Sequence, residues 1–203
     1  MHERRFDPSR MHKLEDPDRT NWLPAHEIVD SLGLLPGWTV ADIGAGSGYF
    51  TVPIAKVIGG SGRVFAVDVS RQMLDYLRAK LSAASVGNVQ YIESDAVSTG
   101  LASGCCDCVF LANVWHEFDD PKAIAAEMRR IVTPGARMGV LDWRPDADPV
   151  HGPPLEHRIQ AEEARRLFAE AGFLMEAHVQ LFPFSWFLRG ALPSDTTPAR
   201  GER

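Results

Sequence analysis

The chain has 203 residues, of which 45% are hydrophobic and 24% charged, a composition typical of one globular domain that needs no disulfide. Its 21 basic and 27 acidic side chains give a formal charge of −6 without any block of Lys and Arg, so we expect no nucleic-acid partner. The charged N-terminus is unlike a signal peptide, and no apolar run could span a membrane. With three cysteines crowded into residues 105–108, we expect a cytoplasmic protein.

The apolar pattern predicts helices and strands in alternation. A polar, irregular segment (1–22) precedes a first helix at 24–34. The elements after it are strand 38–43, helix 49–58, strand 63–68, a helix capped by Ser70, strand 88–93, strand 108–112, helix 121–132, strand 136–142, helix 161–171, and two β-like runs at 173–180 and 184–188. This alternation predicts a parallel sheet with helices on both sides, and the short last connection predicts an antiparallel hairpin. The fold class is therefore α/β, with a doubly wound mixed sheet of seven strands.

Three alternating glycines follow the first predicted strand in VADIGAGSGYF (40–50). A glycine-rich turn between the first strand and its helix is where such a sheet receives a nucleotide-like ligand. The dinucleotide motif needs a glycine where this chain has Tyr49, and the Gly-Lys-Ser/Thr of a phosphate loop does not occur. Asp42 precedes the first glycine by two residues; it would repel a pyrophosphate but suits a ligand with ammonium and sulfonium groups.

Acidic residues also follow the second and third predicted strands. Asp68 ends the second strand, where a carboxylate can accept from both hydroxyls of an unmodified ribose. Asp95, in ESDA (93–96), is placed to accept from an adenine amino group. Each has a local alternative, because Asp68 could cap the next helix and Asp95 could be a turn residue.

Five segments occur in order along the chain: VADIGAGSGYF, VFAVDVSRQML, ESDA, VFLANVWHEFDDP and PGARMGVLDW. Together they resemble the class I S-adenosylmethionine-dependent methyltransferases, in particular the small branch similar to the ubiquinone/menaquinone-biosynthesis methyltransferases, over roughly residues 20–190. The resemblance implies S-adenosyl-L-methionine as cofactor and a Rossmann-like sheet in the order 3-2-1-4-5-7-6, with strand 7 antiparallel. We expect a segment covering the active site (1–37), a cofactor-binding domain (38–190) and a flexible tail (191–203).

The resemblance also implies roles for individual residues in the cofactor site. The glycines would pass under the methionine part of the cofactor, with Asp42 supporting its amino group. Asp68 would hold the ribose, Asp95 and Ala96 would frame the adenine, and Asn113 would close the site. The full expected set is Asp42, Gly44, Ala45, Gly46, Gly48, Asp68, Val69, Asp95, Ala96 and Asn113.

The acceptor should lie beyond the carboxyl ends of the first and fourth strands. His116, just after the fourth strand, is the candidate catalytic base, because an imidazole titrates near neutral pH; a packed, hydrogen-bonded ring is the alternative. The candidate substrate contacts are Trp115, Trp143, His151 and His157. The last two lie on a proline-rich loop placed to form a lid, and their spacing does not favour a metal site.

We therefore expect methyl transfer to a small-molecule acceptor by a monomer or homodimer with no membrane or nucleic-acid partner. Three alternatives stay open. One is an arsenite, metalloid or thiol methyltransferase that would use the clustered cysteines. The second is a nicotinamide-dependent oxidoreductase, against which Tyr49 argues, and the third is a non-catalytic protein that binds a nucleoside cofactor.

Overall fold

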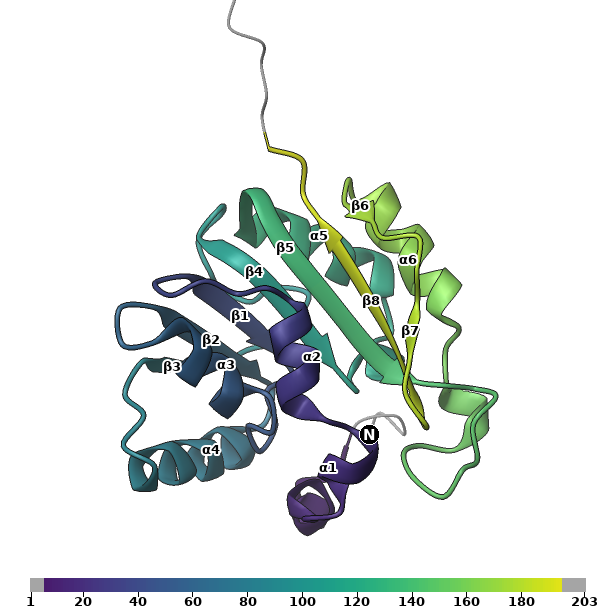
Figure 1. Ribbon diagram of the computed structural model, residues 1–203, viewed down its shortest axis with the longest axis horizontal. Coiled ribbons are helices and arrows are strands. Elements are labelled where there is room, and N and C mark those ends of the chain that lie inside the picture. The colour runs from purple at the N-terminus through teal and green to yellow at the C-terminus, as the bar shows by residue number, and fades with distance from the viewer. Residues whose placement is uncertain (1–5, 195–203) are drawn as a thin grey trace, which may run out of the picture.

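The computed structural model describes residues 6–194 and contains one mixed sheet in the order β3-β2-β1-β4-β5-β8-β6, with β7 paired to β8 (Figure 1). The strands are β1 (Thr39–Ile43), β2 (Arg63–Asp68), β3 (Val89–Glu93), β4 (Cys106–Ala112), β5 (Val132–Trp143), β6 (Leu174–Met175), β7 (Gln180–Leu181) and β8 (Ser185–Ala191). The helices are α1 (Arg19–Trp22), α2 (Ala25–Ser31), α3 (Thr51–Ile58), α4 (Arg71–Ala83), α5 (Pro121–Ile131) and α6 (Ala161–Glu170), with 3-10 helices η1 (Pro8–Glu15), η2 (Trp115–Glu117) and η3 (Leu155–His157).

The expected strand order is confirmed. β1 to β5 run parallel to one another, and β8 is antiparallel to β5, β6 and β7. The number of strands was wrong, because the run at 173–180 contains two short strands that pair with different parts of β8. No helix within residues 6–194 is long and apolar enough to cross a bilayer.

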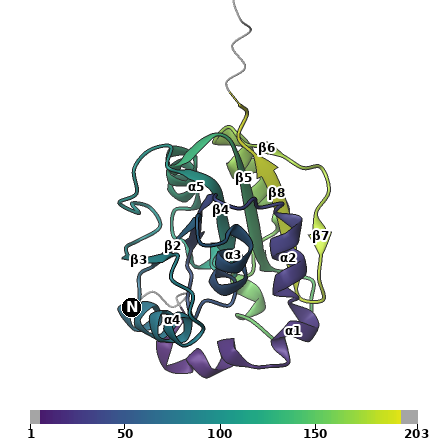
Figure 2. The ribbon, with the colours of Figure 1, turned by 60° about the vertical axis from the view of Figure 1, so that its left-hand side comes forward.

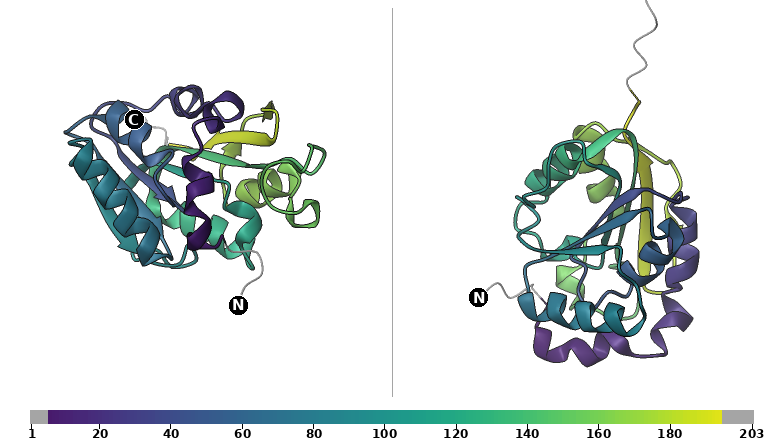
Figure 3. Two further views of the ribbon diagram at one scale, coloured as in Figure 1. Left: turned by 90° about the horizontal axis from the view of Figure 1, so that it is seen from below. Right: turned by 90° about the vertical axis from the view of Figure 1, so that its left-hand side faces the viewer.

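Helices cover both faces of the sheet (Figure 3). α2 and α3 pack with Phe110 of β4 on one face, and α4 lies against β2 on the same face. α5 and α6 pack on the other face, against Val109 and Leu111 of β4. Side chains along β4 thus alternate between two apolar layers, as expected for a parallel strand buried on both sides.

Local sequence explains most of the helix boundaries. Ser70 is the N-cap of α4, and its hydroxyl accepts from the N–H of Met73 at 3.3 Å. Asp120 is the N-cap of α5, whose first residue is Pro121. The strand expected at 136–142 begins earlier, because Val132 already pairs with β4 ahead of a register shift. The Thr-Pro-Gly sequence at 133–135 therefore lies within an irregular stretch of β5 instead of preceding the strand.

The two ends of the domain differ from expectation. The N-terminal segment was expected to be irregular, but it forms η1 and α1, which cross beneath the carboxyl ends of the parallel strands (Figure 2). At the other end, β8 continues to Ala191 and Leu192 is buried, so the packed fold extends beyond residue 190. Residues 195–203 of the expected tail lie outside the described residues.

Candidate active site

A cavity of about 1050 Å³ opens at the carboxyl ends of the parallel strands. Its walls come from the turn after β1, the end of β2, the loop after β3 and the segment after β4. The N-terminal segment and the loop at 149–157 complete the enclosure. This is the position at which open α/β sheets bind ligands, and the volume is large enough for a cofactor together with a small acceptor.

Most of the residues expected at the site line this cavity. They are Asp42, Gly44, Ala45, Gly46, Asp68, Val69, Asp95, Ala96, Asn113, His116, Trp143, His151 and His157. Gly48 and Trp115 do not. Trp115 is fully buried and packs against Phe118 and Phe168, with ring centroids 5.9 and 5.0 Å away, so the structure places it in the core and not in the cavity wall.

The three glycines of the turn meet different steric demands. Gly44, Gly46 and Gly48 have φ of 72°, 52° and 83°, a backbone region that favours glycine. A Cβ on Gly48 would lie 2.1 Å from Leu77 of α4, and a Cβ on Gly44 would lie 2.7 Å from Val114. A Cβ on Gly46 would have no neighbour closer than 3.8 Å. Gly48 thus permits helix packing, whereas a Cβ at Gly46, in the cavity wall, would make only ordinary contacts.

The backbone N–H groups of this turn are already used within the protein. Gly44 and Ala45 both donate to the carbonyl of Val67, at 2.8 and 3.1 Å. Gly46 donates to the carboxylate of Asp68 at 2.8 Å. A phosphate-binding turn needs N–H groups free for the anion, so this turn does not fit a pyrophosphate. These hydrogen bonds are stronger evidence against a dinucleotide ligand than the presence of Tyr49 at the third glycine position of the dinucleotide motif.

Asp42 is a buried acid beneath the turn, 2% exposed, and it accepts from the hydroxyl of Thr51 at 2.6 Å. Burial, together with the nearby charge of Asp68, raises the pKa of Asp42 to about 7 despite that hydrogen bond. No ion pair joins Asp42 to a cation within residues 6–194. A ligand ammonium in the cavity would supply the missing countercharge.

Asp68 is held in one orientation by the backbone. One carboxylate oxygen accepts from Gly46 and the other from the N–H of Ser70, both at 2.8 Å. The helix cap is the hydroxyl of Ser70, so Asp68 is not the capping residue of α4. Burial raises the pKa of Asp68. Each oxygen has acceptor capacity left for a ligand hydroxyl, which fits a ribose.

Asn113 is the clearest sign that the cavity takes a polar ligand. It has a φ of 56°, and its N–H donates to the carbonyl of Leu141 at 2.8 Å. Both polar atoms of its side chain are buried without a protein partner. A buried amide without partners is costly, and this one lines the cavity, so a bound ligand would satisfy it. Nearby, Asp95 accepts from the N–H of Val97 at 3.1 Å, as a turn residue does.

His116 is positioned by Asp142 at the end of β5. The Nδ1 atom lies 2.8 Å from one oxygen of Asp142, and the backbone N–H of His116 donates to the other at 3.0 Å. Nε2 lies 3.9 Å from Glu117. Burial lowers the pKa of His116, but Asp142 and Glu117 outweigh that effect and leave it above its ordinary value. Burial also raises the pKa of Glu117, to about 7.

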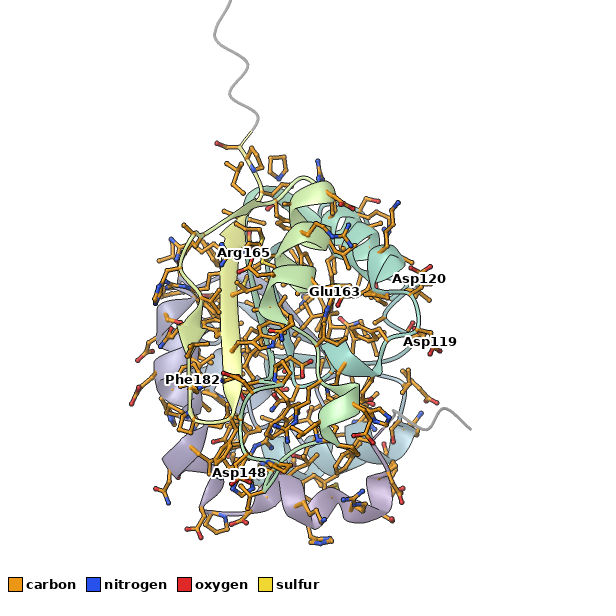
Figure 4. All side chains as sticks on the ribbon, turned by 90° about the vertical axis from the view of Figure 1, so that its right-hand side faces the viewer. Asp119, Asp120, Asp148, Glu163, Arg165 and Phe182 are labelled. Atoms are coloured by element: carbon orange, nitrogen blue, oxygen red, sulfur yellow. The ribbon has the colours of Figure 1, made fainter. Side chains whose placement is uncertain are left out.

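The N-terminal segment and the loop after β5 meet over the cavity. Trp22 stacks on His151, with ring centroids 4.5 Å apart, and lies 5.8 Å from Trp143. Arg158 organises the loop by donating to four of its carbonyls, among them that of His151. This loop, marked by Asp148 in Figure 4, lies at the carboxyl end of the sheet. The sequence contained no local signal for these contacts, since they join segments far apart in the chain.

The cysteines lie away from the cavity, at the opposite end of β4. None of them lines it, and Cys106 and Cys108 are fully buried on different faces of the sheet. Burial raises the pKa of the Cys108 thiol to about 12 and raises that of Cys106 as well. These thiols are therefore not placed to hold an acceptor. Within residues 6–194, no three His, Cys, Asp or Glu side chains are grouped to hold a metal ion.

Comparison with known proteins identifies methyltransferases as relatives. A family model described as a methyltransferase domain matches residues 41–140. The ubiquinone/menaquinone biosynthesis C-methyltransferase of Klebsiella pneumoniae is 31% identical over 124 residues, which are 60% of this chain and 49% of that protein. This chain thus matches about half the length of that relative.

Solved structures extend the likeness to nearly the whole chain. The crystal structure of a SAM-dependent methyltransferase from Aquifex aeolicus has a TM-score of 0.86 and 28% identity, and covers 93% of this chain and 100% of that one. Phosphoethanolamine N-methyltransferase 2 of Haemonchus contortus shares the fold. Its TM-score is 0.71 and its identity 15%, and the likeness covers 85% of this chain and 53% of that one. Its motifs, its sheet and these relatives show that the chain belongs to the class I S-adenosylmethionine-dependent methyltransferases.

Proposed function

We propose that the protein transfers a methyl group from S-adenosylmethionine to a small-molecule acceptor. The observation that carries this proposal is the convergence of Asp42, Asp68 and the unpartnered Asn113 amide on one cavity. When bound, the cofactor would supply an electrophilic methyl group on a sulfonium. The protein's own part is to hold that group, to orient the acceptor and to remove a proton where the acceptor carries one.

The cofactor contacts follow from the chemistry of the wall. Asp68 would accept from the ribose hydroxyls and Asp42 from the ammonium group. Asp95 and Ala96 would border the adenine, and the exposed side chain of Val69 would be covered by the nucleoside. These roles agree with the steric and hydrogen-bonding features of the turn, which leave room at Gly46 for a ligand without offering an anion site.

His116 is the proposed catalytic base. Because Nδ1 faces Asp142, Nε2 is the atom left to accept a proton, and the carboxylate would stabilise the resulting imidazolium. Asp142 is fully buried and acts only through His116, so it is a positioning residue. This pair supports an oxygen or nitrogen acceptor that must lose a proton during methyl transfer.

The acceptor is proposed to be small because the protein's own segments cover much of the cavity. Trp143, His151 and His157 line it on the side of the proline-rich loop, and Trp22 stacks on His151 above it. A macromolecular acceptor would have to displace this stack. A metalloid acceptor would find no protein thiol among the residues that line the cavity.

Calorimetry with S-adenosylhomocysteine and NADH tests the proposal. The wild-type protein should bind S-adenosylhomocysteine and not NADH. Asp68→Asn should weaken S-adenosylhomocysteine about ten- to a hundredfold, because it removes a charge-assisted contact to the ribose. Asp75→Asn, an exposed change on α4, is the matched control and should have no effect. A folded wild-type protein that binds NADH but not S-adenosylhomocysteine would overturn the proposal.

A further inference from the structure

Arg19 is a buried cation in the cavity wall that forms no ion pair within residues 6–194. It is 6% exposed and lines the cavity. Its Nη1 donates to the carbonyl of Leu14 at 3.0 Å, and its guanidinium lies over the ring of Tyr49, 4.1 Å from the centroid. Both carboxylate oxygens of the neighbouring Glu15 bind Lys80, at 3.0 and 2.8 Å. No ion pair joins Arg19 to an acid within residues 6–194.

A guanidinium carries five N–H donors, and here one hydrogen bond to the protein is formed. Burial of a charge with most of its donors unused is costly, and burial lowers the pKa of Arg19 to about 10. The planar donor fork matches a carboxylate, which can accept two of these N–H groups at once. The position of Arg19 on the cavity wall therefore indicates that a ligand carries an anionic group next to it.

In the proposed binding mode, the part of the cofactor nearest to Arg19 would be its amino-acid end. Arg19 lies on Tyr49, which directly follows the last glycine of the turn, and Asp42 lines the cavity beneath the same turn. The N–H groups of Gly44, Ala45 and Gly46 are not free for a carboxylate, because they donate to Val67 and Asp68. A buried acid and a buried cation on one wall match the ammonium and the carboxylate of a zwitterion.

We propose that Arg19 binds the α-carboxylate of the cofactor and that this contact fastens the N-terminal segment (6–23) over the site. The proposal rests on the cofactor binding proposed above. The segment is suited to respond to such a contact, because η1 buries none of its residues. It is held to α4 by the pair of Glu15 and Lys80, and beside the turn by Arg19.

The test compares S-adenosylhomocysteine with 5′-methylthioadenosine, which has the same nucleoside but lacks the amino-acid end. By calorimetry, Arg19→Gln should weaken S-adenosylhomocysteine about ten- to a hundredfold and leave 5′-methylthioadenosine within twofold. His12→Gln, an exposed change in the same segment at a residue that does not line the cavity, is the control and should change neither affinity. If Arg19→Gln does not fold, Arg19→Lys keeps the charge but loses the fork and should show the same selective weakening.

Other outcomes would overturn the inference in distinguishable ways. Equal weakening of both ligands would make Arg19 a structural residue. Unchanged affinity for both ligands would rule out a contact between Arg19 and the cofactor carboxylate. A wild-type protein that binds neither ligand would remove the proposed function itself.

Hydrogen exchange gives an independent readout of the segment. S-adenosylhomocysteine should slow exchange across residues 6–23 of the wild-type protein, and 5′-methylthioadenosine should leave it unchanged. In Arg19→Gln, saturating S-adenosylhomocysteine should no longer protect the segment. Equal protection of the wild-type segment by both ligands would contradict the proposed link between the carboxylate and the segment.

Discussion

Replacing Asp42 with asparagine should stabilise the ligand-free protein at pH 8. The pKa of Asp42 is raised from 3.8 to about 7, first by burial and then by the charge of Asp68. Between these two pH values the folded protein keeps a proton that the unfolded chain has lost, so the free energy of unfolding falls as the pH rises. At pH 8 the full difference applies, on the order of 4 kcal/mol.

Asparagine keeps the shape of the side chain and can still accept from Thr51, but it carries no charge to bury. Thermal unfolding of the ligand-free variant at pH 8 should therefore shift upward by on the order of 10 °C for a domain of this size. At pH 5 the gain should fall to less than half, because the native carboxyl is then protonated and only the unfolded chain is ionised.

The same variant should bind S-adenosylhomocysteine more weakly, since the ammonium group loses its carboxylate partner. Denaturation curves at pH 5 and pH 8, with and without S-adenosylhomocysteine, measure both effects. Thr20→Ser, an exposed change in the N-terminal segment, controls for nonspecific shifts. A variant that is no more stable than the wild type at pH 8, or that gains equally at both pH values, would refute the reasoning.

Three further predictions concern other parts of the site. Asp142→Asn should lower kcat by about 10²–10⁴-fold and move the acidic limb of the pH–rate profile to lower pH, because His116 loses the charge that raises its pKa; an unmoved limb would rule His116 out as the base. Gly48→Ala should cost about 2–4 kcal/mol of unfolding free energy through its clash with Leu77, measured by urea denaturation, whereas Gly46→Ala should cost less but weaken S-adenosylhomocysteine more. Replacing all three cysteines with serine should lower stability but preserve methyl transfer by the folded fraction, and a folded yet inactive variant would revive a thiolate mechanism.

The sequence predicted the parts of the fold that depend on local pattern. Buried strands and amphipathic helices predicted a parallel sheet with helices on both sides, because each parallel crossover needs a helix. The strand order came from the resemblance to the methyltransferases. Two of the errors involve long-range pairing. Val132 pairs with Cys106 of β4 and so belongs to β5, and β6 and β7 are separate strands that pair with different parts of β8.

The candidate site divides in the same way. Asp42, Asp68 and Gly46 could be placed from the sequence, because their roles depend on position relative to a strand end. The pairing of His116 with Asp142 could not, because it follows from the register between β4 and β5. Arg19 was missed because its environment is created by Tyr49 and the cavity, and nothing in the neighbouring sequence signals them.

The glycine turn shows how one sequence pattern selects one kind of ligand. In a phosphate-binding turn, glycine frees backbone N–H groups to point at an anion. Here the same residue type brings the turn close to β2, where Val67 and Asp68 accept those N–H groups. What remains exposed to the cavity is carboxylate, from Asp42 and Asp68. The wall therefore favours a ligand that presents hydroxyls and a positive charge, and any negative group on that ligand needs a cation from elsewhere. The buried guanidinium of Arg19 lies beside the turn. The N-terminal segment therefore adds a positive charge to a site where Asp42 and Asp68 supply negative charge.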